Sequence, residues 1–307
     1  MEAAAGFEPA NRGFANLSLR PLGYAANAGV LSRILYSSRR LAFRFALNHA
    51  ITVVEVTKIL NYSLVIITLN EADRLEKCLQ SAHAAAEVVV VDSGSVDGTV
   101  ALAGRYGARV VETDWPGHVA QKNRALALAS HEWVLSLDAD ESLSDKMVRY
   151  LDTLTEQDLE GVNGVSFSRC STWLGKRLRH GKWYPDRRVR LVRRTCAQWG
   201  GDDPHDTLQV TGTVVCADVD IDHVPYRSFQ EQLDTIDRYT AIAAKSLAKR
   251  GVRARIVDVF MRPPVHFVVA YVLKRGFLDG IAGLLVALLG AYYTGLKWTR
   301  LYRMTGR

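Results

Sequence analysis

The sequence lacks the spaced cysteines and glycine-rich loops by which several large protein classes are recognised. Its four cysteines include no C-x-x-C pair, which argues against a zinc knuckle or a disulfide framework and favours a reduced, cytosolic protein. Neither G-x-G-x-x-G nor G-x-x-x-x-G-K-[ST] follows the early strand patterns, so neither a dinucleotide-binding fold nor a P-loop is favoured. No aromatic RNP-like strand is present, which counts against an RNA-binding module.

Long uninterrupted apolar runs are also scarce. Near the N-terminus, arginines interrupt the apolar stretch and no small-residue cleavage site follows it, so no cleavable signal is expected. Between residues 265 and 296, two apolar runs are each shorter than the roughly 20 residues that a spanning helix needs. The flanking residues are basic: Arg262, Lys297, Arg300 and Arg303. We expect helices that lie in, or dip into, an anionic leaflet; a helical pair packed on the protein or in a dimer interface is the alternative.

What is present is an ordinary globular composition with an excess of positive charge. Of the 307 residues, 48% are apolar and 23% charged, so the chain can bury a sizeable core. The formal net charge of +7 suits a chain that meets an anion, whether a nucleotide, a phospholipid surface or a nucleic acid. Charge alone does not choose among these ligands.

Strand and helix patterns alternate from about residue 61. Residues 1–60 have no clear periodicity, and we predict a poorly ordered or basic amphipathic leader there, with residues 33–47 as the candidate helix. Strands are predicted at residues 62–69, 87–91, 109–112 and 133–137, with helices between them and Asn70 capping the first helix. This rhythm indicates right-handed βαβ units, hence an α/β fold with a mostly parallel central sheet. The predicted regions are a catalytic domain at 61–227 and C-terminal, membrane-associated helices at 228–307.

After residue 144 the rhythm changes. A further helix is expected to about residue 155 and a strand at 165–170, followed by a basic segment with tryptophans from Trp173 to Arg188. Residues 188–193 alternate like an edge strand, and strand-like runs flank Gly212. Ser228-x-x-Glu231 is a capping box that opens a helix ending near Gly251.

Acidic residues follow two of the predicted strands. Asp92 ends the second strand, while Asp138, Asp140 and Glu141 follow the fourth. Because parallel strands end at the same edge, Asp92 and Asp138 should emerge together, in the crevice where ligands bind. Asp92 is a candidate to accept hydrogen bonds from a nucleobase or ribose, and Asp97 either assists it or caps the next helix. The Asp-x-Asp pair offers hard oxygens to Mg²⁺ or Mn²⁺.

Four sequence blocks together resemble glycosyltransferase family 2, which has the GT-A fold. They are LVIITLNE (64–71), VVDSGSVDGT (90–99), QKNRA (121–125) and LDADE (137–141). The likeness is greatest to lipopolysaccharide core β-glucosyltransferases that act on inner-core heptose, and it runs from about residue 62 to 300. Each block alone is a weak signal, whereas the four in this order are specific.

The resemblance assigns a role to each matching residue. The nucleotide sugar would be bound by Asn70, Glu71, Asp92, Asp97, Lys122, Asn123 and Asp138. Mg²⁺ or Mn²⁺ would be held by Asp140 with Asp138 and His223. The general base would be Asp206, where the lipopolysaccharide group usually carries glutamate, with Asp202 and Asp203 as alternatives. The acceptor would meet Trp183, Arg187 and Arg188. The plain alternatives are an exposed helix face for Lys122 and Asn123, a structural histidine for His223 and an acidic surface loop at 202–206.

The predicted function is therefore an inverting transfer of a sugar from a nucleotide donor, with UDP-glucose the expected one, to a hydroxyl of a glycolipid. Such an enzyme would work at the anionic cytoplasmic face of the inner membrane and would need no nucleic acid. One alternative keeps the fold but uses a polyprenyl phosphate acceptor, which is already anionic and needs no base. Others are a nucleotide- or RNA-binding module without catalysis and a degenerate scaffold, against which the intact acid set argues.

Overall fold

The computed structural model describes residues 43–47, 50–54, 59–202 and 205–306. Residues 1–55 and 56–307 are separate compact units. In the first, β1 (Phe43–Leu47) pairs antiparallel with β2 (Ala50–Val54). The end of the candidate amphipathic helix is thus a strand, which corrects that part of the prediction, because its apolar residues alternate with period two. Residues 33–42 of that candidate helix, like Asp203, lie outside the described residues.

The second unit is built on a central sheet whose first half matches the predicted strands. The strands β3 (Tyr62–Thr68), β4 (Glu87–Asp92), β5 (Arg109–Glu112) and β6 (Trp133–Asp138) are all parallel, in the order β5-β4-β3-β6. Through β3, Asp92 and Asp138 reach the same edge, as predicted.

Beyond β6 the sheet is mixed. It continues through β10 (Asp186–Arg193), β8 (Gly164–Trp173), β13 (Val214–His223) and β7 (Glu141–Leu143), and β9 (Lys176–Arg177) pairs with β8. Only β8 and β13 run parallel among these pairs. The prediction that residues 188–193 form an edge strand is wrong, because β10 lies between β6 and β8. Its alternating arginines suggest a solvent-facing side, but Arg190 is buried beside carboxylates.

Two layers cover the sheet, and alternate residues of β3 divide between them. Leu64 and Ile66 pack in the core under α1 (Ala72–Ser81), α2 (Thr99–Arg105) and α4 (Asp145–Thr153). Val65 packs on the opposite face with α3 (His118–Leu128) and a hairpin of β11 (Ala197–Asp202) and β12 (His205–Val210). Asn70 does not cap α1: the N-cap is Glu71, and Asn70 adopts a left-handed φ of 57°.

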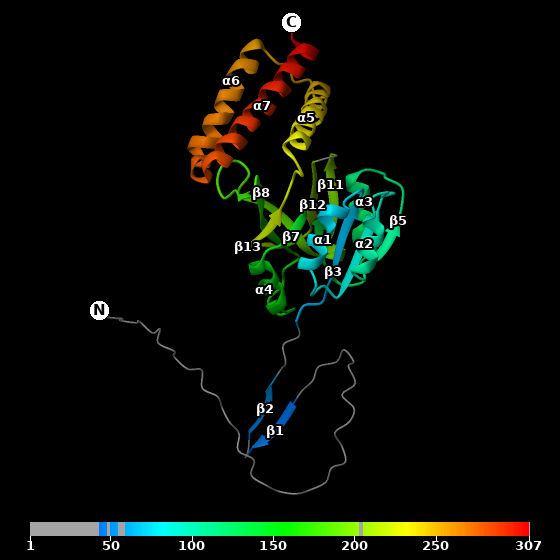
Figure 1. Cartoon of the computed structure of the whole chain (residues 1–307). Coiled ribbons are helices and arrows are strands. Elements are labelled where there is room, and N and C mark those ends of the chain that lie inside the picture. Colours follow the sequence, from blue (N-terminus) through cyan, green and yellow to red (C-terminus); the bar gives the residue numbers. More distant parts are fainter. Residues whose placement is uncertain (1–42, 48–49, 55–58, 203–204, 307) are drawn as a thin grey trace, which may run out of the picture. The chain divides into compact units, whose positions relative to one another are not determined.

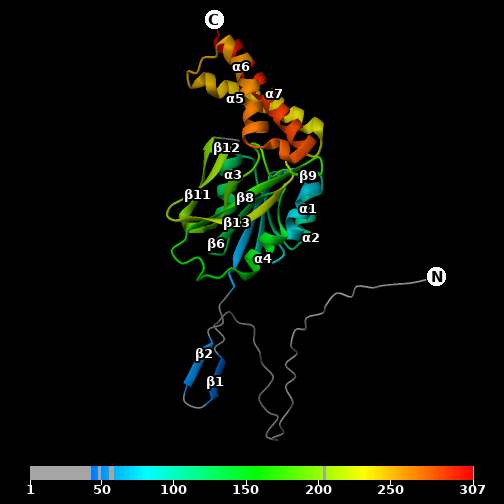
Figure 2. The same ribbon diagram turned by 90° about the vertical axis from the view of Figure 1, so that its left-hand side faces the viewer.

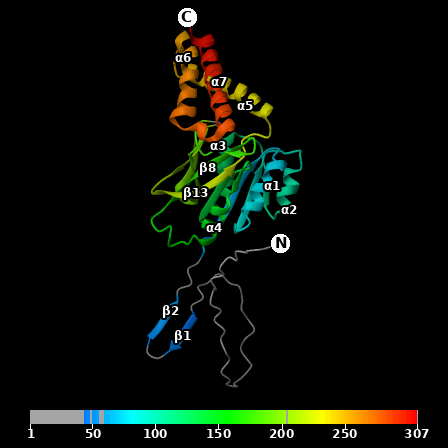
Figure 3. The ribbon, with the colours of Figure 1, turned by 60° about the vertical axis from the view of Figure 1, so that its left-hand side comes forward.

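The chain ends in helices grouped beyond the carboxyl ends of the parallel strands (Figures 1 and 2). They are α5 (Phe229–Lys249), α6 (Ile256–Phe267), the π-helical η2 (Val268–Leu273), the short η3 (Gly276–Asp279) and α7 (Gly280–Thr305). Helix α5 begins at the predicted cap, where Ser228 accepts a hydrogen bond from the Glu231 amide. Helices α6 and α7 form an antiparallel pair (Figure 3).

The C-terminal apolar segments are longer than the sequence runs indicated. Residues 256–273 and 276–305 are helical stretches of 18 and 30 residues that are long and apolar enough to cross a membrane by length and composition alone. The expectation that both were too short is wrong, because the helices continue through the flanking residues, Arg300 and Arg303 among them. Of the first stretch only 6% is buried, so α6 exposes most of its apolar surface.

Glu87 joins the start of β4 to its neighbours. It accepts hydrogen bonds from Ser63 on β3, from Ser130 and from Arg109 on β5. Burial alone would raise the pKa of Glu87, but these hydrogen bonds outweigh it and lower the pKa to about 2. Its carboxylate therefore stabilises the fold at pH values above its ordinary pKa of 4.5, and this stabilisation is lost as the pH falls towards 2.

Replacing Glu87 by glutamine should lower the free energy of unfolding at pH 7 by about 1–3 kcal/mol, because the remaining amide accepts fewer and weaker hydrogen bonds. Urea unfolding at pH 7 and at pH 3 measures the effect, and the difference from wild type should shrink at the lower pH. The exposed Glu160→Gln is the matched control. A difference that is the same at both pH values would contradict this role of Glu87.

Candidate functional site

The acidic turn after β6 is held by buried arginine. Asp138 is the last residue of β6, and its two carboxylate oxygens lie 2.7 Å from Lys122 Nζ and 2.6 Å from Arg190 Nη2. Arg190 also contacts Glu141 at 2.6 Å, and Glu141 accepts a hydrogen bond from the Asp138 amide. The charges of Lys122 and Arg190 outweigh burial and hold the pKa of Asp138 well below its usual range. Asp138 is therefore an ionised carboxylate whose two oxygens are already paired.

Lys122 brings together two acids that lie far apart in the sequence. From the middle of α3, its Nζ lies 2.7 Å from both Asp138 Oδ1 and Asp206 Oδ2. The ammonium group also lies 4.3 Å from the centroid of the Trp199 ring. Burial would lower the pKa of Lys122, but Asp138 and Asp206 raise it above its ordinary value, so Lys122 is charged. The exposed helix face that was the alternative for Lys122 is excluded.

A cavity of about 390 Å³ opens at these residues. Among the described residues that line it, five are cationic and two are acidic: Lys122, Arg169, Arg187, Arg188 and Arg190 against Asp138 and Asp206. The indole N–H of Trp199, another residue of the wall, is buried and has no hydrogen-bond partner. Because unpaired buried donors are costly, the wall is suited to a ligand that supplies acceptor oxygens and negative charge.

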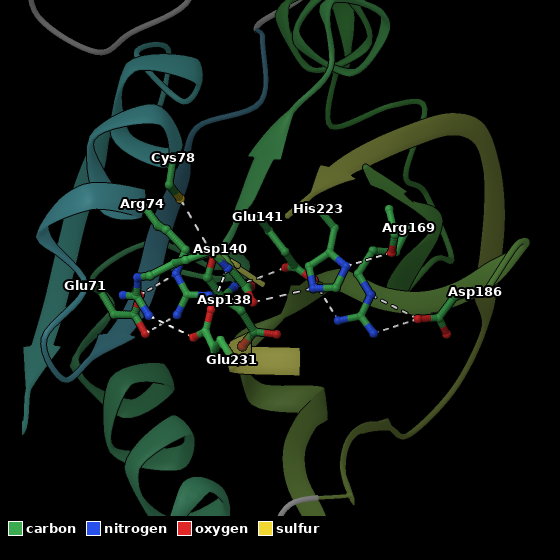
Figure 4. Close-up of polar contacts among 12 residues, drawn as sticks. Glu71, Arg74, Cys78, Asp138, Asp140, Glu141, Arg169, Asp186, His223 and Glu231 are labelled. Atoms are coloured by element: carbon green, nitrogen blue, oxygen red, sulfur yellow. Dashed lines mark hydrogen bonds and ion pairs between the residues drawn. The ribbon is translucent and has the colours of Figure 1, made fainter. Parts of the chain in front are cut away.

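Asp140 and His223 face each other next to this turn. Asp140 Oδ2 lies 3.5 Å from His223 Nε2, and Arg74 Nη1 lies 3.8 Å from the same oxygen. His223 Nδ1 is 2.9 Å from Ser171 Oγ, which orients the ring and leaves Nε2 towards Asp140. Figure 4 shows Asp138 and Asp140 between Glu71 and Arg74 on one side and His223 and Arg169 on the other.

These two side chains fit a divalent cation that shares its ligands with a substrate. The described residues contain no group of three or more histidine, cysteine or acidic side chains placed as a metal site. Mg²⁺ is commonly held by one or two carboxylates together with substrate phosphates, so Asp140 and His223 are a sufficient protein contribution. Asp138 is paired with Lys122 and Arg190 in the protein alone, and its assignment as a further metal ligand stays a prediction.

Asp92 lies at the predicted edge but has no free acceptor. One carboxylate oxygen accepts hydrogen bonds from the hydroxyls of Thr68 and Ser95, and the other accepts them from the amides of Gly94 and Ser95. These four bonds use the acceptor capacity of a carboxylate. Within the protein its carboxylate shapes the loop at 93–95, and the expectation that Asp92 receives a nucleobase or ribose stays a prediction.

The neighbouring donor-binding candidates are also paired within the protein. Asp97 accepts hydrogen bonds from Thr99 and from the Ala72 amide, so it joins the start of α2 to the start of α1, although the N-cap of α2 is Gly98. Asn70 accepts a hydrogen bond from the Val96 amide.

Glu71 is paired with two arginines. Its carboxylate oxygens lie 2.6 Å from Arg74 Nη2 and 3.1 Å from Arg227 Nη2. Arg227 lies just before α5, so Glu71 joins the loop after β3 to the C-terminal helices.

Asn123 and the proposed acceptor residues take different positions. The side-chain amide of Asn123 donates to the backbone carbonyl of Trp199 and accepts from its backbone amide, so it anchors β11, and its contact with a sugar-nucleotide donor stays a prediction. Arg187 and Arg188 line the 390 Å³ cavity, whereas Trp183 lines a second pocket against the C-terminal helices. The structure does not bring the three together. The side chain of Asp202 is not described.

Sequence reasoning missed the cations that balance the acids. Arg190 stands in the stretch RRVRLVR, where its strand position was visible but its burial was not. Trp199 gave no signal, because it lies in a short strand without apolar periodicity. The opposite charges of Arg190 and the acidic turn were the available hint, but they are 49 and 52 residues apart.

Comparison with known proteins identifies the family to which this chain belongs. Residues 63–208 match the family model of glycosyl transferase family 2. The lipopolysaccharide core biosynthesis glycosyltransferase LpsC of Rhizobium meliloti is 30% identical over 248 residues, which cover 78% of this chain and 92% of that protein. An uncharacterised glycosyltransferase of Rickettsia conorii is 26% identical over 254 residues, covering 78% and 89%. A mannosyltransferase of Pyrobaculum calidifontis, solved with GDP-mannose and Mn²⁺, is 18% identical over 76% of this chain and 73% of its own, with a TM-score of 0.45.

Proposed function

This chain belongs to glycosyltransferase family 2, and on that basis we propose that it transfers a hexose from a nucleotide sugar to a hydroxyl of a lipopolysaccharide core or related glycolipid, with inversion at the anomeric carbon. Glucose from UDP-glucose is the donor that we favour. The proposal is carried by one observation: Lys122 bridges Asp138 and Asp206 at 2.7 Å in a cavity with an excess of arginine. The acceptor class is supported by the likeness to LpsC over 92% of that protein.

The cationic wall of the 390 Å³ cavity is the proposed binding site for the diphosphate of the sugar donor. Lys122 and Arg190 are balanced by Asp138 and Glu141 in the protein alone, and a diphosphate would compete for the same cations. As the diphosphate draws Lys122 towards its oxygens, the Asp206 carboxylate loses that ion-pair partner and is left to face the acceptor hydroxyl. Donor binding and activation of the base are thereby linked through one ammonium group.

Asp206 is the proposed general base. Among the described residues, its Oδ1 accepts no hydrogen bond, so that oxygen can take the proton of an acceptor hydroxyl. As the proton leaves, the acceptor oxygen bonds to the anomeric carbon and the bond from that carbon to the diphosphate breaks. The aspartate in place of the usual glutamate has a reach shorter by one methylene.

Asp140 and His223 would hold Mg²⁺ or Mn²⁺, with Ser171 orienting the histidine ring. A divalent cation bound there supplies positive charge to the oxygens of the leaving diphosphate. The exposed apolar residues of α6, with Arg255 and Arg262 beside them, support attachment to the cytoplasmic face of the inner membrane.

A panel assay tests the proposal. Purified protein is incubated with Mg²⁺ or Mn²⁺ and individual sugar nucleotides, with and without deacylated lipopolysaccharide core, and product is followed by mass spectrometry. We expect a hexose to be added to the core from one nucleotide sugar, with chelation of the metal abolishing the addition. Transfer to polyprenyl phosphate and not to the core would favour the alternative function, an enzyme with a polyprenyl phosphate acceptor. The arginines Arg187 and Arg188 in the cavity wall support that alternative.

A further inference from the structure

A second pocket lies between the loop at 178–183 and the C-terminal helices. Its volume is about 200 Å³, and Lys182, Trp183, His266 and Tyr293 are among its lining residues. It shares no lining residue with the 390 Å³ cavity. Nothing in the proposed transfer reaction uses it.

The loop at 178–183 is fixed to the helices by hydrogen bonds, so the pocket has a defined wall. Asp279 accepts bonds from the backbone amides of Arg179 and His180 at 3.1 and 2.9 Å and lies 2.9 Å from the His180 ring. The Gly181 amide donates to the Lys274 carbonyl at 2.8 Å. Asp279 is thereby held against the loop, and its one ion-pair contact among the described residues is with His180.

Those cations gather around a neutral histidine. Lys182 Nζ lies 3.3 Å from His266 Nδ1, which is also 3.0 Å from Thr294 Oγ1. Burial and the charges of Lys182 and Lys297 lower the pKa of His266 to about 4. Among the described residues, Lys182, Lys274 and Lys297 form no ion pair with a carboxylate.

The positive charges of these three lysines are therefore not balanced by ion pairs with carboxylates of the described residues. Burial and the charge of Lys274 lower the pKa of Lys182, and burial with the charges of Arg262 and Lys182 lowers the pKa of Lys297. Arg262 has its own partner, Asp258, at 2.9 Å. A cluster of like charges with no counter-charge favours the binding of an anion.

The surroundings of the cluster select the kind of anion. The helices that carry it expose large apolar side chains: Phe260, Leu273 and Ile281 are 69%, 70% and 77% exposed. A free phosphate makes no use of such a surface, whereas a lipid places its phosphate at the boundary between an apolar phase and water.

Lys182 lines the pocket, and Lys297 Nζ lies 5.5 Å from the ring centroid of Tyr293, another lining residue. We propose that Lys182 in the pocket, with Lys297 and Lys274 near its edge, binds the phosphate group of a membrane lipid, while the apolar faces of α6 and η2 contact its acyl chains. This site goes beyond the transfer reaction and does not depend on the identity of the sugar donor. It fixes the height of the catalytic unit above the membrane, because the loop at 178–183 directly follows β9, which pairs with β8 of the central sheet.

Vesicle flotation tests the site without any sugar transfer. Full-length protein is mixed with phosphatidylcholine vesicles containing phosphatidic acid, or a fatty acid at matched surface charge. The double variant Lys182→Gln/Lys297→Gln is compared with the control Lys245→Gln/Lys249→Gln, which removes two exposed lysines of α5. Thermal melts followed by circular dichroism establish that both variants are folded.

Wild type should prefer the vesicles with phosphatidic acid, and the pocket variant should lose roughly 30-fold in partitioning to them, the factor expected from two lysines at an anionic surface. The control should lose less than roughly threefold, because its lysines lie outside the pocket. Equal losses in the two variants, or no preference of wild type for phosphatidic acid, would overturn the proposal. The proposal would also be overturned if inorganic phosphate raised the melting temperature of the wild-type protein as much as the lipid does, because the site would then bind the free ion.

Discussion

Asp206→Asn is expected to lower kcat by about 10²- to 10⁴-fold, the usual contribution of a general base. The amide cannot take the proton of the acceptor hydroxyl, while its size leaves the cavity wall unchanged. Lys122 keeps its contact with Asp138, so donor binding should be retained. Initial rates with the nucleotide sugar and core acceptor identified by the panel assay, together with donor affinity by calorimetry, measure the two effects separately.

The matched control is Asp218→Asn, which changes an exposed acid on β13 outside the cavity and should leave kcat within about twofold of wild type. Full activity of Asp206→Asn would remove the general base from the mechanism. That result would favour an acceptor that is already anionic, such as a polyprenyl phosphate, over a hydroxyl.

Arg190→Met is expected to lower the free energy of unfolding by about 3–5 kcal/mol. Arg190 is buried and lies 2.6 Å from both Asp138 and Glu141, of which Glu141 is fully buried. Removing one partner leaves buried carboxylates without their counter-charge, and methionine cannot donate the lost hydrogen bonds. Urea unfolding followed by fluorescence measures the loss.

Two further variants separate charge from packing at this position. Arg190→Lys keeps the charge and should recover part of the loss, although lysine cannot donate to both carboxylates with the geometry of arginine. Arg188→Met removes a half-exposed arginine of the same strand whose partner is Asp186, and should cost less than about 1 kcal/mol. If Arg190→Met and Arg188→Met lost equal stability, the buried cluster would not be held as described.

The predictable part of this protein is the part whose signals are local in sequence. The runs at 62–69 and 87–91 are apolar on both faces, which is typical of covered parallel strands, and the predicted GT-A fold is confirmed by the family match and the sheet order. The same holds for Ser228 as the N-cap of α5 and for the common edge reached by Asp92 and Asp138, although Glu231 accepts from the Arg227 amide and so completes no capping box.

The rest depends on long-range pairs that no periodicity records. Lys122 and Asp206 are 84 residues apart, and only the fold brings their side chains to 2.7 Å. Arg190 was missed because an arginine in an alternating strand resembles a solvated position. The place of Asp92 after a strand was predicted, but its hydrogen bonds to Gly94 and Ser95 in the following loop were not.

The central claim is that Asp140 and His223 hold a divalent cation together with the nucleotide diphosphate. Its most direct test is Mn²⁺ binding by electron paramagnetic resonance in the presence of UDP, with wild type compared with Asp140→Asn. We expect wild type to bind Mn²⁺ when UDP is present, and the variant to bind it at least roughly tenfold more weakly, since even outer partners of metal ligands contribute that much. Equal Mn²⁺ affinity in the two proteins would contradict the account.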